Sequence, residues 1–212
     1  PANNLILVAV VNTAASGTTN DVPTITSASS TWVAINDNFF DSGGETGRLT
    51  LFRTLFGSET TEVATIGTGP NTDNSCSWAM SAFASVDTTG SFGSGAIVQN
   101  AENNANATSL TVTLAAFGST DNATYLCGGY AQAGSHAFTN GVGFTTIHNS
   151  ESTTPAYGVG TEWRNDNDTG ADYSIGGAAT VLGGIAVEIK FAAAGGTVVQ
   201  DLIMSGIIPF AR

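Results

Sequence analysis

Basic residues are scarce in this chain. Its 212 residues include only five Lys plus Arg, against seventeen Asp plus Glu, and Lys190 is the only lysine. The resulting net charge of −12 repels phosphate groups, so we expect no nucleic-acid partner and no binding to an anionic membrane. Charged residues make up only 10% of the chain, which leaves few of the straight-chain residues that favour helices. A mainly helical protein is therefore not expected.

Long apolar runs and a cysteine framework are also missing. The sequence offers no stretch of about eighteen uncharged apolar residues, and hence no candidate for a spanning helix or for membrane insertion. The apolar segment 5–11 has no basic residue before it, so we do not expect a signal peptide. Cys76 and Cys127 lie far apart in the sequence. They fit two small buried thiols, with a single disulfide as the alternative.

Turn formers and β-tolerant polar residues dominate what is present. Thr, Ser, Asn and Gly together account for 92 of the 212 residues, and 42% of the chain is hydrophobic. This composition can bury a full core and favours strands joined by tight turns. The sequence thus predicts an all-β fold, an antiparallel β-sandwich of jelly-roll type.

Alternating apolar residues predict about ten strands. The clearest are Ser109–Leu114 and Ile185–Phe191, where every second residue is apolar. The segment Leu5–Val11 is apolar on both faces, so it is either a central strand covered twice or a subunit contact. The polar segment Gln99–Thr108 is expected to be an exposed loop. The remaining predicted strands are Thr31–Asn36, Arg48–Phe56, Glu62–Ile66, Ser77–Val86, Ala123–Gln132, Gly143–His148 and Tyr157–Arg164.

The two halves of the chain resemble each other. The segment 32–36 (WVAIN) is similar to 144–148 (FTTIH), and 51–53 (LFR) is similar to 162–164 (EWR). We therefore consider a β-sandwich domain over residues 1–192 that is internally duplicated, with halves at 1–100 and 109–192. The alternative is chance similarity between strands.

Residues suited to catalysis are few. His136 and His148 are expected at the surface or at a strand edge. Glu151 with Glu162, or Asp166 with Asp168, could form the carboxylate pair of a glycosidase, but acidic loops of this kind are usually only solvated. We expect no enzymatic activity.

The segment 165–172 (NDNDTGAD) is the richest in oxygen ligands. Asp166, Asp168 and Asp172 alternate along it as a Ca²⁺ site would require, although the glycine and the missing final glutamate depart from the EF-hand pattern. An ordinary Asx-turn loop has the same composition. No other cofactor is expected.

Nearby aromatic residues suggest a sugar-binding platform. Trp163, Tyr157 and Tyr173 lie beside the acidic loop in sequence, and aromatic faces stack on sugar rings. For Trp163 a place in the core is the competing interpretation. Arg53 and Arg164 each follow an aromatic residue in a strand, and one of them is expected at a subunit contact.

The C-terminal segment 193–212 joins a Gly-rich stretch to an apolar tail. Such a tail is too apolar to remain in water, and we expect it to insert into a neighbouring subunit rather than fold back. With the doubly apolar first strand, it gives a set of predicted assembly residues: Leu5, Leu7, Val198, Leu202, Ile203, Ile207 and Phe210.

Four segments together carry a family resemblance. The segments 3–10 (NNLILVAV), 48–52 (RLTLF) and 80–83 (MSAF), with the Trp32 strand between the first two, resemble β-sandwich proteins encoded by tailed phages and prophages. The resemblance implies a virion accessory: a capsid decoration, head-fibre or tail-associated protein that forms oligomers with itself and other virion proteins. The alternative is an extracellular carbohydrate-binding module that binds surface glycans, assisted by calcium.

Overall fold

The computed structural model describes residues 3–15, 17–41, 43–57, 63–71, 73–131, 136–153, 156–192 and 204–209. These residues form fifteen β-strands and one short 3-10 turn, Ser94–Ala96. Every pairing between the strands is antiparallel. The all-β class predicted from composition is confirmed.

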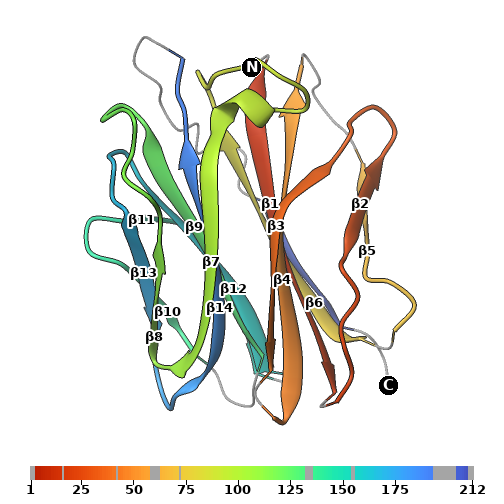
Figure 1. The fold of residues 1–212 in the computed structure, drawn as a ribbon. Coiled ribbons are helices and arrows are strands. Elements are labelled where there is room, and N and C mark those ends of the chain that lie inside the picture. The colour runs from red at the N-terminus through yellow and green to blue at the C-terminus, as the bar shows by residue number, and fades with distance from the viewer. Residues whose placement is uncertain are drawn as a thin grey trace.

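The strands group into four sheets (Figure 1). Sheet I has the order β15-β6-β1-β4-β3, and sheet II has the order β11-β12-β9-β14-β7; an outer sheet has the order β10-β13-β8, and β2 and β5 form an outer pair. In chain order the strands are β1 (Asn4–Ala15), β2 (Thr24–Ser27), β3 (Val33–Asp41), β4 (Glu45–Phe56), β5 (Ala64–Gly67), β6 (Asp73–Phe83), β7 (Ile97–Ala107), β8 (Ser109–Thr113), β9 (Ala123–Ala131), β10 (Phe138–Asn140), β11 (Thr145–Thr153), β12 (Ala156–Arg164), β13 (Gly170–Ile175), β14 (Thr180–Ile189) and β15 (Met204–Pro209).

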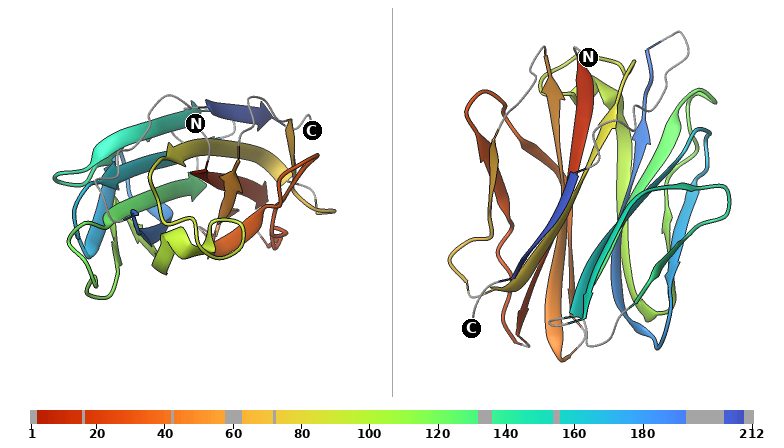
Figure 2. Two further views of the ribbon diagram at one scale, coloured as in Figure 1. Left: turned by 90° about the horizontal axis from the view of Figure 1, so that it is seen from above. Right: turned by 180° about the vertical axis from the view of Figure 1, so that it is seen from behind.

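Sheets I and II pack face to face, and each outer face carries a further layer (Figures 1 and 2). The central core lies between the two large sheets. A second core lies between sheet II and the outer sheet, and a third between sheet I and the β2-β5 pair. The molecule is thus a sandwich covered on both sides.

Strand β1 shows why this arrangement suits the sequence. Leu5 and Leu7 point into the central core, whereas Ile6 and Val8 point into the third core. All four are at most 2% exposed, and burial of each such side chain contributes about 1.5–3 kcal/mol. A strand that is apolar on both faces needs a sheet that is covered on both sides. Of the two roles predicted for this segment, a central strand or a subunit contact, β1 has the first.

Glycine pairs in sheet II make room for large residues from the neighbouring layers. The Tyr173 ring lies against Gly128 so closely that a Cβ there would be 2.5 Å from the ring. Phe40 of sheet I occupies the same kind of space at Gly183, where a Cβ would be 2.4 Å from its ring. These glycines allow the layers to interlock.

The prediction of an exposed loop at 99–108 is wrong, because these residues form most of strand β7. Its exposure alternates along the strand, and Ala101 and Ala105 pack on the second core. Small and amide side chains give almost no hydrophobic alternation, so the strand depends on pairing with β14. Four other strands were also not predicted as strands: β2, β10, β13 and β15.

The C-terminal segment differs from its expected role. Strand β15 pairs with β6 of its own chain, from Met204 opposite Met80 to Pro209 opposite Ser75. In Figure 2 this dark blue strand lies beside the yellow β6. Met204–Pro209 is therefore part of sheet I and not a tail held by a neighbour, because the edge of β6 offers it a row of backbone hydrogen-bonding groups.

Candidate functional site

The polar residues predicted as sites gather around one turn, at Gly141–Gly143 between β10 and β11. Arg164, the last residue of β12, donates a 3.2 Å hydrogen bond to the Val142 carbonyl. Glu162, two residues earlier on the same face of β12, accepts a 3.2 Å hydrogen bond from the Gly141 N–H. We call this group the β10–β11 turn site.

The acidic loop is held by the same arginine. Arg164 forms ion pairs of 2.5 Å with Asp166 and 2.6 Å with Asp168. Hydrogen bonding to Asp166 raises the pKa of Arg164, with smaller contributions from both carboxylates. Asp168 also accepts a 2.9 Å hydrogen bond from the Gly170 N–H, which is the geometry of an Asx turn.

The three aspartates of the predicted calcium site do not converge. Asp166 and Asp168 face Arg164, whereas Asp172 lies on β13 with its side chain next to Gly141. Within the described part of the chain, no three His, Cys, Asp or Glu side chains are grouped so that they could hold a metal ion. Because a guanidinium already balances the two loop carboxylates, this arrangement gives the calcium hypothesis no support.

Glu162 is the most perturbed acid of the turn site. It is only 4% exposed, and its Oε1 atom has no partner among the described residues. Burial raises its pKa to about 8; the hydrogen bond from Gly141 opposes this shift, and the negative charge of Asp172 adds to it. When the Asn140 amide is turned so that its nitrogen faces Glu162, that nitrogen lies 3.2 Å from Oε2.

A small cavity adjoins Glu162 between sheet II and the outer sheet. Its volume is about 10 Å³, which is room for about one water molecule. Its lining includes Asn140, Asn149, Phe138 and Tyr173. A cavity of this size can hold a solvent molecule beside a protonated carboxyl, but not a sugar ring.

The predicted sugar platform is wrong, because its aromatic residues do not share a surface. Tyr157 and Tyr173 are 1% and 4% exposed. Tyr173 belongs to the second core, while Trp163 packs against the central core on the opposite face of sheet II. Tyr173 also donates a 3.0 Å hydrogen bond to the Gly183 carbonyl, so its hydroxyl is already used inside the protein.

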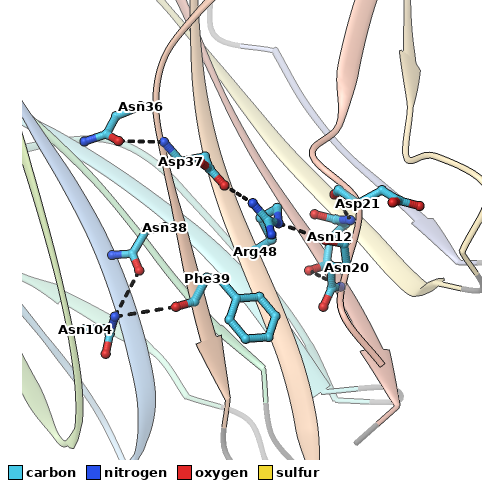
Figure 3. Close-up of polar contacts among 9 residues, drawn as sticks. All are labelled: Asn12, Asn20, Asp21, Asn36, Asp37, Asn38, Phe39, Arg48 and Asn104. Carbon is cyan, nitrogen blue, oxygen red and sulfur yellow. Dashed lines mark hydrogen bonds and ion pairs between the residues drawn. The ribbon is translucent and has the colours of Figure 1, made fainter. Parts of the chain in front are cut away.

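A second polar region joins the two large sheets where β3 meets β7 (Figure 3). Asn38 of β3 is 1% exposed and donates to the carbonyls of Asn103 (2.6 Å) and Gly184 (3.1 Å). Its own oxygen accepts from Asn104 at 3.2 Å. These bonds hold the edge of sheet I to sheet II through neutral groups.

Arg48 lies on the adjacent strand β4 and pairs with Asp37 (Figure 3). Its Nε donates to the Asn20 carbonyl at 3.0 Å, and its guanidinium lies 5.5 Å from the centre of the Phe39 ring. The bonds of Asn38 and Arg48 reach neighbouring strands and loops, which gives this region a structural role.

Most of the remaining reactive residues are buried, whereas His148 is half-buried on the edge strand β11, in agreement with its expected strand-edge position. His136 is 4% exposed and its Nδ1 lies 2.8 Å from the Gly176 carbonyl, so its expected surface position is wrong. Burial lowers the pKa of His148. Cys76 and Cys127 are free and buried, as the first interpretation predicted, and burial raises the pKa of Cys76 to about 12.

The predicted assembly residues fall into three groups. Leu5 and Leu7 are fully buried in the central core, so they cannot contact another subunit. Ile207 lies in β15, opposite Ser77 of the same chain. Outside the described residues are Val198, Leu202, Ile203 and Phe210.

The chain matches no protein-family model, no curated protein and no solved structure. In the described residues we find no helix with the length and apolar character needed to cross a membrane.

Sequence reasoning missed Asn140. It is a single amide in a polar stretch, and nothing in its sequence context distinguishes it from a surface asparagine. Glu162 was named, but as half of a glycosidase pair with Glu151. The usable signal was the position of Glu162 between Thr161 and Trp163 in a strand. Successive side chains of a strand point to opposite faces, so Glu162 lies on the face opposite to these two residues, and in the structure that face is under the outer sheet.

Proposed function

We propose that this protein is a structural subunit of a virion, a capsid decoration, head-fibre or tail-associated protein that forms oligomers with sister copies and binds other virion proteins. The observation that carries the proposal is the stack of four sheets around three apolar cores. Such a body is rigid and thick, which suits a load-bearing or shielding role.

The charge arrangement supports the same role. Arg48, Arg164 and Lys190 each pair with an aspartate of the same chain. Charged residues make up only 10% of the chain, and Thr, Ser and Asn are abundant, so we expect many neutral hydroxyl and amide groups at the surface, which tolerate close contact with many neighbours. The excess of acidic residues argues against contact with packaged nucleic acid.

Contacts between copies then come from strand edges rather than from the apolar strand β1. Within the described residues, β11 pairs only with β12, and β15 pairs only with β6. Each therefore offers one row of backbone donors and acceptors to a strand of another molecule. The exposed large apolar residues add only scattered points of contact, the most exposed being Val63 at 85% and Val142 at 88%.

Measuring the assembly state tests this proposal. Sedimentation velocity of the purified chain over a micromolar range should show a defined oligomer, and antibody labelling should place the protein on virions by electron microscopy. A monomer throughout the range would contradict assembly with sister copies. Absence of label from intact virions would contradict the virion role.

The carbohydrate-binding alternative is less well supported, because Tyr157 and Tyr173 are buried. A glycan array with and without calcium would distinguish it from the structural role. We also propose that the protein has no catalytic activity, because Asp166 and Asp168 are paired with Arg164 and Glu162 is enclosed near Gly141.

A further inference from the structure

The order of strands in sheet I is repeated in sheet II. Sheet I runs β15-β6-β1-β4-β3, and sheet II read in the same direction runs β7-β14-β9-β12-β11. Strands β1, β3, β4 and β6 of the first half thus take the places of β9, β11, β12 and β14 of the second half. The outer pairs agree as well, because β2 pairs with β5 and β10 pairs with β13.

Local irregularities repeat along with the order. The β3-β4 pairing has a bulge between Ala34 and Asn36, and the β11-β12 pairing has one between Thr146 and His148. These bulges fall at Ile35 and Ile147, the same position in the similar segments 32–36 and 144–148. An extra residue at one matched position of one matched strand is a specific feature that chance similarity between strands does not explain.

The pairing also corrects the sequence alignment of β4 with β12. Asn36 lies opposite Leu51, and His148 lies opposite Thr161. Leu51 therefore corresponds to Thr161, and Arg53 corresponds to Trp163 rather than to Arg164. A shift of one residue reverses the faces of a strand, so the two arginines are not equivalent. Arg53 faces inward, and burial lowers its pKa.

The last strand of each half lies in the sheet of the other half. Strand β7 follows β6 in the chain but pairs with β14, and β15 follows β14 but pairs with β6. The positions also match in detail. Ala101 lies opposite Ala186 of β14, and Met204 lies opposite Met80, which takes the same place on β6. Strand β8 is the one strand of the described set without a counterpart in this scheme.

The two connections meet where they cross. Val86, after β6, forms an isolated antiparallel bridge with Phe191, after β14. The Asp87 N–H donates to the Lys190 carbonyl at 2.9 Å, and the Ala192 N–H donates to the Ser85 carbonyl at 2.8 Å. These two bonds flank the Val86–Phe191 bridge on either side and hold the two connections together.

We propose that residues 4–107 and 123–209 are two copies of one seven-strand unit that complete each other by exchanging their last strands. The open edge of β6 is the acceptor site for Met204–Pro209, and its partner is the second half of the same chain. The molecule is then a strand-swapped dimer joined into one polypeptide. This inference does not depend on the virion role.

Engineered cysteine pairs test the exchange in the full-length chain. Met80→Cys with Met204→Cys places two thiols opposite each other on β6 and β15, and Ala101→Cys with Ala186→Cys is the matched pair in the other sheet. Directly opposed strand positions are within reach of a disulfide. After mild oxidation, both variants should give monomer-sized bands on non-reducing gels, with the linked peptides found by mass spectrometry.

Two other outcomes would overturn the inference. Reduction-sensitive dimers of the Met80→Cys, Met204→Cys variant alone would mean that the tail pairs with another molecule. No cross-link in that variant, with a cross-link in the matched pair, would mean that β15 is not on β6. If the double variant does not fold, Ile208→Cys replaces it, because residue 208 lies opposite the native Cys76.

Cutting the chain between the halves tests their mutual dependence. A protease site inserted at Gly118, in the exposed loop between β8 and β9, allows cleavage after folding. The two fragments should remain in one particle on dilute size exclusion and separate only in denaturant. Fragments that elute apart and stay folded would refute the exchange.

Discussion

The buried carboxyl of Glu162 makes stability depend on pH in a definable window. Its pKa rises from an ordinary 4.5 to about 8 in the folded protein, chiefly because of burial. Between these values the folded state holds the proton and the unfolded state releases it, so the free energy of unfolding decreases as pH increases. The full effect is present below pH 4.5 and is lost as pH rises through about 8.

The pKa difference sets an upper limit of roughly 5 kcal/mol on this loss. Hydration of the cavity beside Glu162 and movement of the Gly141 turn will reduce it. Glu162→Gln removes the titration and keeps the shape of the side chain. Urea unfolding followed by tryptophan fluorescence should therefore show wild-type stability falling between pH 5 and 8, relative to the variant, by several kcal/mol.

Comparison with a matched carboxylate separates this effect from general charge repulsion in an acidic protein. Glu151 is exposed on the neighbouring strand β11, so Glu151→Gln removes the same charge without removing a buried group. This control should retain the wild-type pH dependence. Parallel pH profiles for wild type and Glu162→Gln would refute the reasoning.

Three further predictions concern packing, hydrogen bonding and thiol reactivity. Gly183→Ala should lower the free energy of unfolding by about 1–3 kcal/mol in urea titrations, because the new methyl group meets the Phe40 ring. Asn38→Ala should cost about 1–3 kcal/mol in the same assay, because it removes the buried bonds between the sheets. Cys76 and Cys127 should not react with a thiol reagent at neutral pH in the native protein, because both are buried and their pKa values are raised.

Matched controls accompany these measurements. Gly118→Ala adds a methyl group where nothing lies within 4 Å, so it should leave stability nearly unchanged. Asn36→Ala removes an amide that bonds only to the adjacent Asp37 N–H in the described hydrogen bonds, and it should cost much less than Asn38→Ala. Both thiols should react fully in denaturant. Equal effects of test and control variants, or rapid reaction of the native thiols, would contradict the respective prediction.

The sequence predicted strands best where apolar residues alternate. Each of the ten predicted segments overlaps a strand of the structure. The prediction failed at β7, where Asn and small residues give little alternation, and it also missed β13, although Ala171, Tyr173 and Ile175 alternate with polar residues there. Those strands exist because β14 and β8 present open edges to them, and an open edge is not a local property of sequence.

Site prediction was weaker because residue type does not show which partner a side chain contacts. Asp166 and Asp168 have the composition of a cation site, but both form ion pairs with Arg164, two and four residues earlier. Tyr157 and Tyr173 are suitable for a sugar platform by type, yet both are buried, and Tyr173 lies in the second core. Residue types indicate which chemistry is available, and burial decides whether it is accessible.

Composition and alternation by themselves determined the all-β class, because period-two apolar patterns with few helix-favouring residues favour strands that bury one face of a sheet. Tertiary structure alone decided which edge each terminal strand occupies. A β-strand can pair with any open edge of suitable register, so the exchange of β7 and β15 between the halves follows from how the sheets stack and where the connections cross at Val86 and Phe191.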